Sequence, residues 1–163
     1  MRLMLLLLLA VASQAQTVIR AARVFDGESM REGWAVRIEG DRITAAGPSA
    51  SVSTAQARII DLGGVTLMPG LVEGHSHILL HPYNETPWND QVLKEGVALR
   101  AARAVNHLRS TLMAGFTTMR DLGTEGAGYA DVELQQALRE GIAIGPRTLV
   151  ATRAIVATGA YAP

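Results

Sequence analysis

The sequence predicts an α/β protein in which a small β-rich part precedes a parallel sheet covered by helices. Hydrophobic residues make up 48% of the 163 residues and charged residues only 18%, a composition that supports a packed core. Residues 17–68 form short apolar segments separated by turn residues, whereas residues 69–163 alternate strand-like with helix-like segments. Strands that alternate with helices typically form a parallel sheet through right-handed crossovers.

Residues 1–15 have the pattern of a signal peptide. Arg2 provides the positive start, Leu3–Val11 an apolar stretch, and Ser13-Gln14-Ala15 small residues two positions apart. A membrane-spanning helix needs about 20 apolar residues, and this stretch is interrupted after about ten. We therefore expect cleavage after Ala15, export to the periplasm or beyond the cell, and no stable membrane anchor.

The β-rich part, residues 17–68, contains several expected strands. Trp34–Ile38 and Arg42–Ala46 flank the turn residues Glu39-Gly40-Asp41, which predicts a hairpin. The other expected strands are Val18–Val24, Ile59–Leu62 and Val65–Met68, the last two separated by Gly63-Gly64.

A domain boundary is expected at Pro69-Gly70, where an apolar run from Leu71 to Leu80 begins. Apolar residues at helical spacing then predict one long helix over residues 90–114, capped by Asn89 or Asp90 and ended by Gly115. The remaining expected elements are a strand over 116–120, a helix over 131–140 ended by Gly141, and a strand over 148–151.

His75 and His77 are the candidate metal ligands. Side chains two apart on a strand point to the same side, so both imidazoles can reach one ion while Ser76 faces away. Two such histidines can also be ordinary loop residues, but sites in α/β proteins form at the carboxyl ends of strands. The chain has no cysteine, so a metal would be held by histidines and carboxylates.

Four other features are weaker candidates. His81 and Tyr83 can line a substrate pocket or belong to a solvated loop, and Asp121 can serve the pocket or a turn. His107 is expected on the helix surface, among charged and polar neighbours. Residues 125–128, Glu-Gly-Ala-Gly, lack the phosphate-binding pattern of glycine and lysine and are expected to form a flexible loop.

The charge balance argues against nucleic acid as a partner. Lys plus Arg and Asp plus Glu both number 15, so the formal net charge is zero. The oligomeric state is left open.

The segment Pro69-Gly70-Leu71-Val72-Glu73-Gly74-His75-Ser76-His77, after a β-rich part with Arg23-Val24-Phe25-Asp26-Gly27, resembles the amidohydrolase superfamily. The resemblance extends over residues 18–163. Within that superfamily, Tyr83 to Gln91 and Ala114 to Gly126 are similar to the Xaa-Pro dipeptidase-like and imidazolonepropionase-related group.

The resemblance implies a TIM-like (β/α)8 barrel after an N-terminal β-sandwich domain over residues 17–68. It also implies one or two divalent ions, commonly zinc, with His75 and His77 as first-strand ligands. A complete barrel takes about 250 residues, so residues 69–163 have room for about three βα units and the barrel is incomplete. The other ligands and the catalytic residues are expected downstream of Pro163.

The expected function is that of the N-terminal portion of an exported metal-dependent hydrolase. It would cleave an amide bond in a dipeptide or cyclic amide through metal-activated water, with this chain alone inactive. An imidazolonepropionase-like cyclic amidase is one alternative. A non-catalytic remnant or interaction protein is another.

Overall fold

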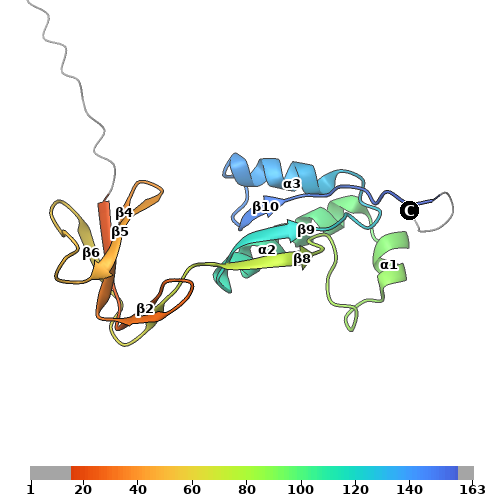
Figure 1. The fold of residues 1–163 in the computed structure, drawn as a ribbon. Helices are drawn as coiled ribbons and strands as arrows, with labels where there is room; N and C mark the ends of the chain where they lie inside the picture. Colours follow the sequence, from red (N-terminus) through yellow and green to blue (C-terminus); the bar gives the residue numbers. More distant parts are fainter. Residues whose placement is uncertain (1–15, 158–163) are drawn as a thin grey trace, which may run out of the picture. The chain divides into compact units, whose positions relative to one another are not determined.

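A computed structural model describes residues 16–157, which form two compact units divided between Pro69 and Gly70 (Figure 1). The expected signal peptide and its cleavage site after Ala15 lie outside the described residues, as does the segment 158–163. Within the described part, no helix has the length and apolar character needed to span a membrane.

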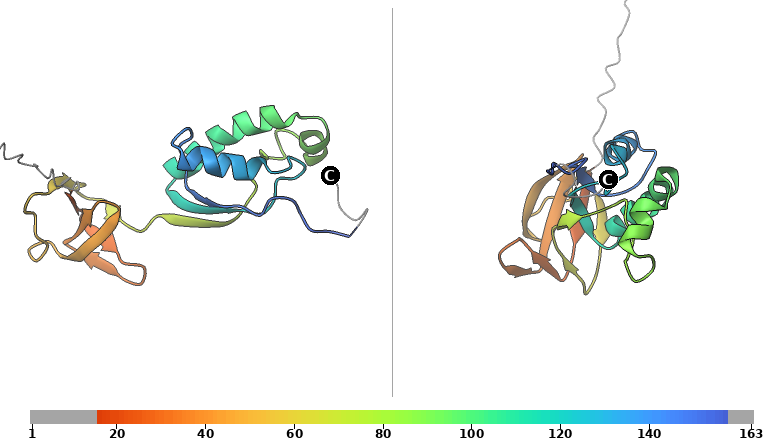
Figure 2. Two further views of the ribbon diagram at one scale, coloured as in Figure 1. Left: turned by 90° about the horizontal axis from the view of Figure 1, so that it is seen from above. Right: turned by 90° about the vertical axis from the view of Figure 1, so that its right-hand side faces the viewer.

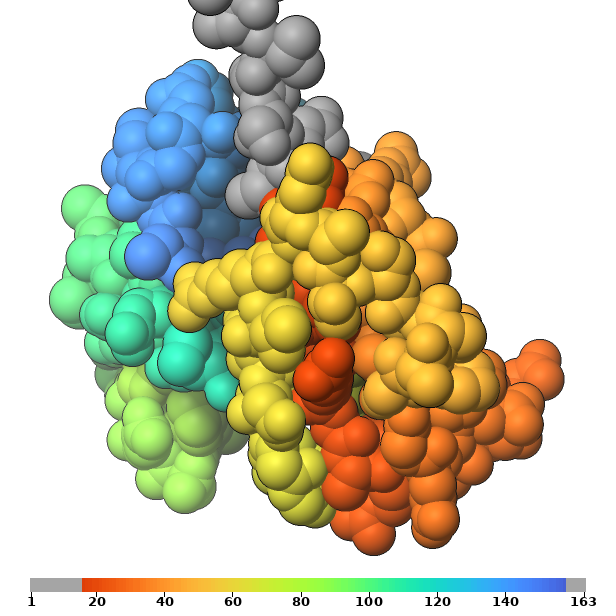
Figure 3. Space-filling model, turned by 90° about the vertical axis from the view of Figure 1, so that its left-hand side faces the viewer, coloured from red at the N-terminus to blue at the C-terminus, as the bar shows by residue number. Residues whose placement is uncertain are grey.

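The larger sheet of the first unit has the strand order β5–β4–β1–β6. Its strands are β1 (Gln16–Arg20), β4 (Trp34–Glu39), β5 (Arg42–Pro48) and β6 (Arg58–Asp61). The predicted hairpin is confirmed as the antiparallel pair β4–β5. Strand β6 runs parallel to β1, and Figure 3 shows the red atoms of β1 next to the gold and yellow segment that contains β6.

A second sheet of the first unit has the order β3–β2–β7, with strands β2 (Arg23–Phe25), β3 (Met30–Glu32) and β7 (Thr66–Leu67). The prediction of one strand over residues 18–24 is wrong, because β1 and β2 belong to different sheets. Between them the Ala22 N–H donates to the Gly63 carbonyl and the Ala22 carbonyl accepts from Gly33 N–H. The chain therefore changes partners at this point.

The first unit has a small hydrophobic cluster. Val18, Ala35 and Val52 are buried together, and Ala45 and Ala57 pack against them. Two sheets and one cluster are compatible with the predicted β-sandwich, which stays a prediction.

The second unit contains a parallel sheet of order β10–β9–β8, as the alternating pattern predicted. Its strands are β8 (Leu71–Ser76), β9 (Phe116–Asp121) and β10 (Arg147–Leu149), and its helices are α1 (Trp88–Leu93), α2 (Val97–Met113) and α3 (Ala130–Arg139). Helices α2 and α3 lie on one face of the sheet (Figure 2). Closure of such a sheet into a barrel stays a prediction.

The core of the second unit lies between the sheet and these two helices. Met119 of β9 packs with residues of α2 and α3 in a cluster of eight buried side chains: Ile78, Leu79, Ala104, Leu108, Met119, Ala127, Ala130 and Leu134. The opposite face is open, since Val72 of β8 is 70% exposed.

The predicted long helix over residues 90–114 is wrong in one respect, because the structure divides it into α1 and α2. Gly96 is the N-cap of α2 and has an extended backbone, with ψ 146°. Helix α1 begins at Trp88 after Pro87, so neither Asn89 nor Asp90 is its cap. The predicted end is confirmed at Gly115, whose φ of 98° suits a residue without a side chain.

The predicted helix over residues 131–140 is confirmed as α3, followed by Gly141 with φ 71°. The predicted strand over 148–151 is shorter and begins earlier, at Arg147.

Candidate functional site

The two candidate ligand histidines lie at the carboxyl end of β8. His75 is the penultimate residue of the strand, and His77 follows its last residue, Ser76. Their ring centroids are 5.5 Å apart and the ring planes meet at 63°. Zinc–nitrogen bonds of about 2.0–2.1 Å place two imidazole centroids about 5 Å apart around one tetrahedral ion. The pair therefore fits shared coordination, although the ligand assignment stays a prediction.

The His77 ring is oriented by the loop that follows β9. Its Nδ1 lies 3.0 Å from the Gly123 carbonyl oxygen, and the Glu125 carboxylate lies 3.7 Å from the same nitrogen. A carbonyl can only accept, so Nδ1 carries a proton, and in the neutral ring Nε2 is then the nitrogen with the lone pair. This is the orientation that metal-binding histidines commonly have.

Two imidazoles are fewer ligands than a complete site needs. Among residues 16–157 there is no group of three or more His, Cys, Asp or Glu side chains that could hold a metal ion. Catalytic zinc sites usually take three protein ligands, so the described residues form only part of such a site.

Asp121 is a buried carboxylate that interacts electrostatically with His77. It ends β9, pairs in register with Ser76, and is completely buried. Neither carboxylate oxygen has a hydrogen-bond partner of normal geometry in the described part of the chain. Burial, and next the charge of Asp131, raise the pKa of Asp121 to about 7, while the backbone amides of Gly123 and Ile78 and the ring of His77 act in the opposite direction.

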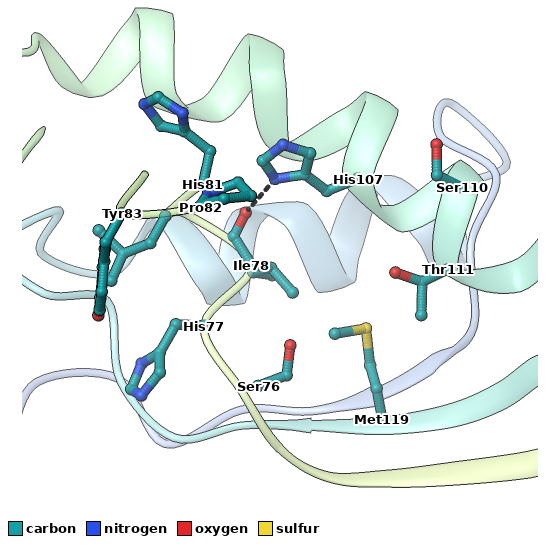
Figure 4. A pocket seen from close by; sticks show the side chains of 11 residues that line it. Ser76, His77, Ile78, His81, Pro82, Tyr83, His107, Ser110, Thr111 and Met119 are labelled. Carbon is teal, nitrogen blue, oxygen red and sulfur yellow. Dashed lines mark hydrogen bonds between the residues drawn. The ribbon is translucent and has the colours of Figure 1, made fainter. Parts of the chain in front are cut away.

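The loop after β8 borders a cavity of about 410 Å³. Figure 4 shows the lining side chains, and the His77 ring points away from Met119 and Thr111. The lining residues are Ser76, His77, Ile78, Leu80, His81, Pro82, Tyr83, His107, Ser110, Thr111 and Met119. The cavity thus lies between the carboxyl end of β8 and helix α2.

Tyr83 and His81 differ in exposure. Tyr83 borders the cavity and is 59% exposed, and its predicted contact with substrate stays a prediction. The side chain of His81 is only 7% exposed, with Nδ1 3.1 Å from the Glu85 carboxylate and Nε2 3.5 Å from that of Glu95. A solvated position for His81 is therefore wrong.

His107 is not the surface residue that its polar neighbours predicted. It is half-buried, its Nδ1 lies 3.2 Å from the Ile78 carbonyl oxygen, and it borders the cavity. The available signal was its place beside Leu108 and three residues after Ala104, on the buried stripe of α2.

Arg100 is the residue that the sequence reasoning missed. It is 1% exposed and donates to three backbone carbonyls, those of Leu79 at 3.0 Å and of Thr124 and Glu125 at 2.9 Å each. Its signal was the helical spacing to Ala104 and Leu108, which are buried on the same face.

The expected flexible loop over residues 125–128 is instead tied to the rest of the unit. Arg100 holds the Glu125 carbonyl, Trp88 Nε1 donates to the Glu125 carboxylate at 3.2 Å, and Thr124 Oγ1 donates to the Gly128 carbonyl at 3.0 Å. These bonds correct the prediction, because two of them tie the segment to α2 and α1 and the third closes the loop on itself.

Two proteins of known name are similar to part of this chain. The allantoinase of Streptomyces avermitilis is 35% identical over 112 residues, which cover 68% of this chain and 21% of that protein. The imidazolonepropionase of Cereibacter sphaeroides is 31% identical over 96 residues, which cover 59% of this chain and 24% of that protein. The chain thus spans less than a quarter of the length of either protein. No family model matches the sequence.

Two solved structures resemble most of the chain. A crystal structure of an amidohydrolase has a TM-score of 0.74 and 31% identity, covering 89% of this chain and 33% of the other. A prolidase complexed with N-methylphosphonate-L-proline has a TM-score of 0.73 and 32% identity, covering 89% of this chain and 34% of the other.

The similar proteins named above, an allantoinase and a prolidase among them, are hydrolases that act on carbon–nitrogen bonds. The chain belongs to the amidohydrolase superfamily, as its histidine motif and these related proteins together establish.

Proposed function

We propose that this chain is the metal-binding, first part of a hydrolase that cleaves an amide or other carbon–nitrogen bond. The observation that carries the proposal is the pair His75 and His77 at the end of β8, with ring centroids 5.5 Å apart. Relatives named allantoinase and prolidase support a carbon–nitrogen bond as the target. The proposed substrate is a dipeptide or a cyclic amide.

The residues of this chain would bind one side of a divalent ion, most simply zinc. The chemistry that such an ion supplies when bound is activation of water and polarisation of the scissile carbonyl. His77 would offer Nε2, since its Nδ1 proton is committed to the Gly123 carbonyl. Tyr83 would contact the substrate, and its exposure at the border of the cavity supports this role.

The first experiment measures zinc binding to the purified chain by calorimetry. We expect one weak site that disappears in both His75→Ala and His77→Ala, because each variant removes one of the two imidazoles. His107→Asn is the matched control, because it alters a half-buried histidine bonded to a carbonyl outside the pair. Unchanged zinc binding in either alanine variant would overturn the ligand assignment.

Hydrolysis is tested with Xaa-Pro dipeptides and with a cyclic amide. We expect no turnover by this chain alone, since two imidazoles are fewer than the three protein ligands usual for catalytic zinc. A chimera in which residues 16–157 replace the matching third of the prolidase should hydrolyse dipeptides and lose activity on His77→Ala. A folded, zinc-loaded chimera without activity would count against the proposal.

Ring opening of a cyclic amide is the second candidate. The likeness to an imidazolonepropionase over 96 residues favours it. A chimera that opens the cyclic amide and leaves dipeptides intact would select this alternative.

We further propose that residues 1–15 direct export and are removed after Ala15. Their supporting features are Arg2, the apolar stretch that follows, and the small residues Ser13 and Ala15. Replacing both small residues by leucine should leave an unprocessed precursor, measurable by mass spectrometry of the exported fraction. Normal processing would contradict the proposed site.

A further inference from the structure

Arg100 joins two loops that the sheet alone would leave apart. Its guanidinium donates through Nε to the Leu79 carbonyl in the loop after β8. Through its two terminal nitrogens it donates to the Thr124 and Glu125 carbonyls in the loop after β9. One side chain of α2 thus holds the loops that follow two neighbouring strands.

Burial of a guanidinium is costly, so its partners matter. Arg100 is 1% exposed, and this burial lowers the pKa of its guanidinium while the charges of Glu95 and Glu125 oppose the shift. The three carbonyls replace part of the lost hydration. A planar fork with several donors suits this arrangement, and a lysine ammonium has no matching geometry.

The loop held by Arg100 is the loop that orients His77. The Gly123 carbonyl, which accepts from His77 Nδ1, directly precedes the two residues that Arg100 binds. On the other side of Gly123, Leu122 N–H donates to the Ser76 carbonyl at 2.8 Å, and Thr124 N–H, in the same peptide unit as the Gly123 carbonyl, donates to the Thr152 carbonyl at 3.0 Å. Gly123 itself has φ 139°, a conformation that favours glycine. The position of the Gly123 carbonyl is therefore set from both ends.

We propose that Arg100 is a positioning residue, which holds the segment Gly123–Glu125 so that the Gly123 carbonyl keeps the proton of His77 on Nδ1 and leaves Nε2 available to a metal. The effect on metal binding rests on the function proposed above. The effect on the His77 ring does not, because it concerns the chain without any metal.

The test uses the whole chain with ¹⁵N-labelled histidine, at about pH 8, where an imidazole of ordinary pKa near 6.5 is neutral. Ring ¹⁵N shifts in the metal-free wild type should show His77 protonated on Nδ1. In Arg100→Lys the ring should become a mixture of both tautomers, and zinc should bind about 10–100-fold more weakly, the usual effect of losing support behind a ligand.

The matched control is Arg103→Lys, on the same helix. Arg103 pairs with the Glu95 carboxylate at 2.7 Å and not with the segment 123–125, so its variant should keep the wild-type tautomer and zinc affinity. Circular dichroism confirms the fold of each variant.

Each outcome decides one question. A His77 ring protonated on Nε2 in the wild type, or a folded Arg100→Lys with unchanged tautomer and zinc affinity, overturns the positioning role. A tautomer that responds to Arg100→Lys in a chain that never binds zinc supports the positioning role and contradicts the proposed function. If Arg100→Lys does not fold, a wild-type His77 ring protonated on Nε2 still overturns the positioning role.

Discussion

Asp121 shows how much depends on the surroundings of a single side chain. Its carboxylate is completely buried, its oxygens have no hydrogen-bond partner of normal geometry among the described residues, and Asp131 adds a repelling charge. A buried polar group without a partner costs about 1–3 kcal/mol, and more when it is charged. The folded chain should therefore resist the ionisation of Asp121.

This ionisation should make the stability of the chain depend on pH. The pKa of Asp121 is about 7 in the folded chain against the ordinary 3.8, so the folded state binds the extra proton between about pH 4 and 7. The stabilisation that the folded state gains from this proton is fully present below about pH 4 and is lost as the pH rises through about 7. Asp121→Asn is neutral and of the same shape, and should raise the free energy of unfolding above pH 7 by roughly 1–3 kcal/mol.

Urea denaturation of both proteins at pH 5 and pH 8 measures this effect. We expect the advantage of the asparagine variant to be larger at pH 8 than at pH 5. An asparagine variant less stable than wild type at pH 8 would show that the carboxylate has a stabilising partner.

Residues of the site differed in how well the sequence predicted them. The spacing of His75 and His77 placed two imidazoles together, because alternation along a strand is a local property. Arg100 was missed and His107 was misjudged because a charged or polar residue on a helix is usually exposed. Their carbonyl partners, such as Leu79 and Ile78, come from another element and leave no local pattern.

At the scale of elements, Gly70 directly before β8 and Gly74 within it make a matched pair. A Cβ added at Gly70 would lie 2.6 Å from Thr117 Cβ and would overlap the rest of that side chain, whereas a Cβ at Gly74 meets nothing within 4 Å. Neither glycine has a positive φ, so the difference between them is one of space.

This difference in space should give two alanine variants different stabilities. Gly70→Ala should destabilise the second unit by about 1–3 kcal/mol, the usual cost of overpacking, and Gly74→Ala should leave it nearly unchanged. Thermal unfolding followed by circular dichroism compares the two. Equal melting temperatures would mean that β8 and β9 can separate without cost at this point.

Element boundaries were predicted least well where the chain changes partner. The break between α1 and α2 at Gly96 was hidden because apolar residues continue at helical spacing on both sides. Strand β3 was missed because Met30, Arg31 and Glu32 are all exposed. The Asp26-Gly27 pair before it was the available hairpin signal.

At the scale of the whole chain, the two units have very different cores. The cluster of the first unit has three buried residues, Val18, Ala35 and Val52, with Ala21, Val24 and Val36 buried outside it, and the cluster of the second has eight. Small domains bury a smaller fraction of their surface and are correspondingly marginal. The sequence predicted the change of texture at Pro69-Gly70 but not this difference, because core size depends on packing between elements.

The last prediction uses the two tryptophans of the chain, one in each unit. Trp34 lies in β4 of the first unit and Trp88 at the start of α1 in the second. In urea, the fluorescence of Trp34 in a Trp88→Phe variant should report a lower midpoint than that of Trp88 in a Trp34→Phe variant, because less apolar surface stabilises the first unit. Circular dichroism of both variants checks that the substitutions themselves leave the total transition unchanged. Coincident midpoints would mean that the small cluster of the first unit is stabilised by more than its own residues.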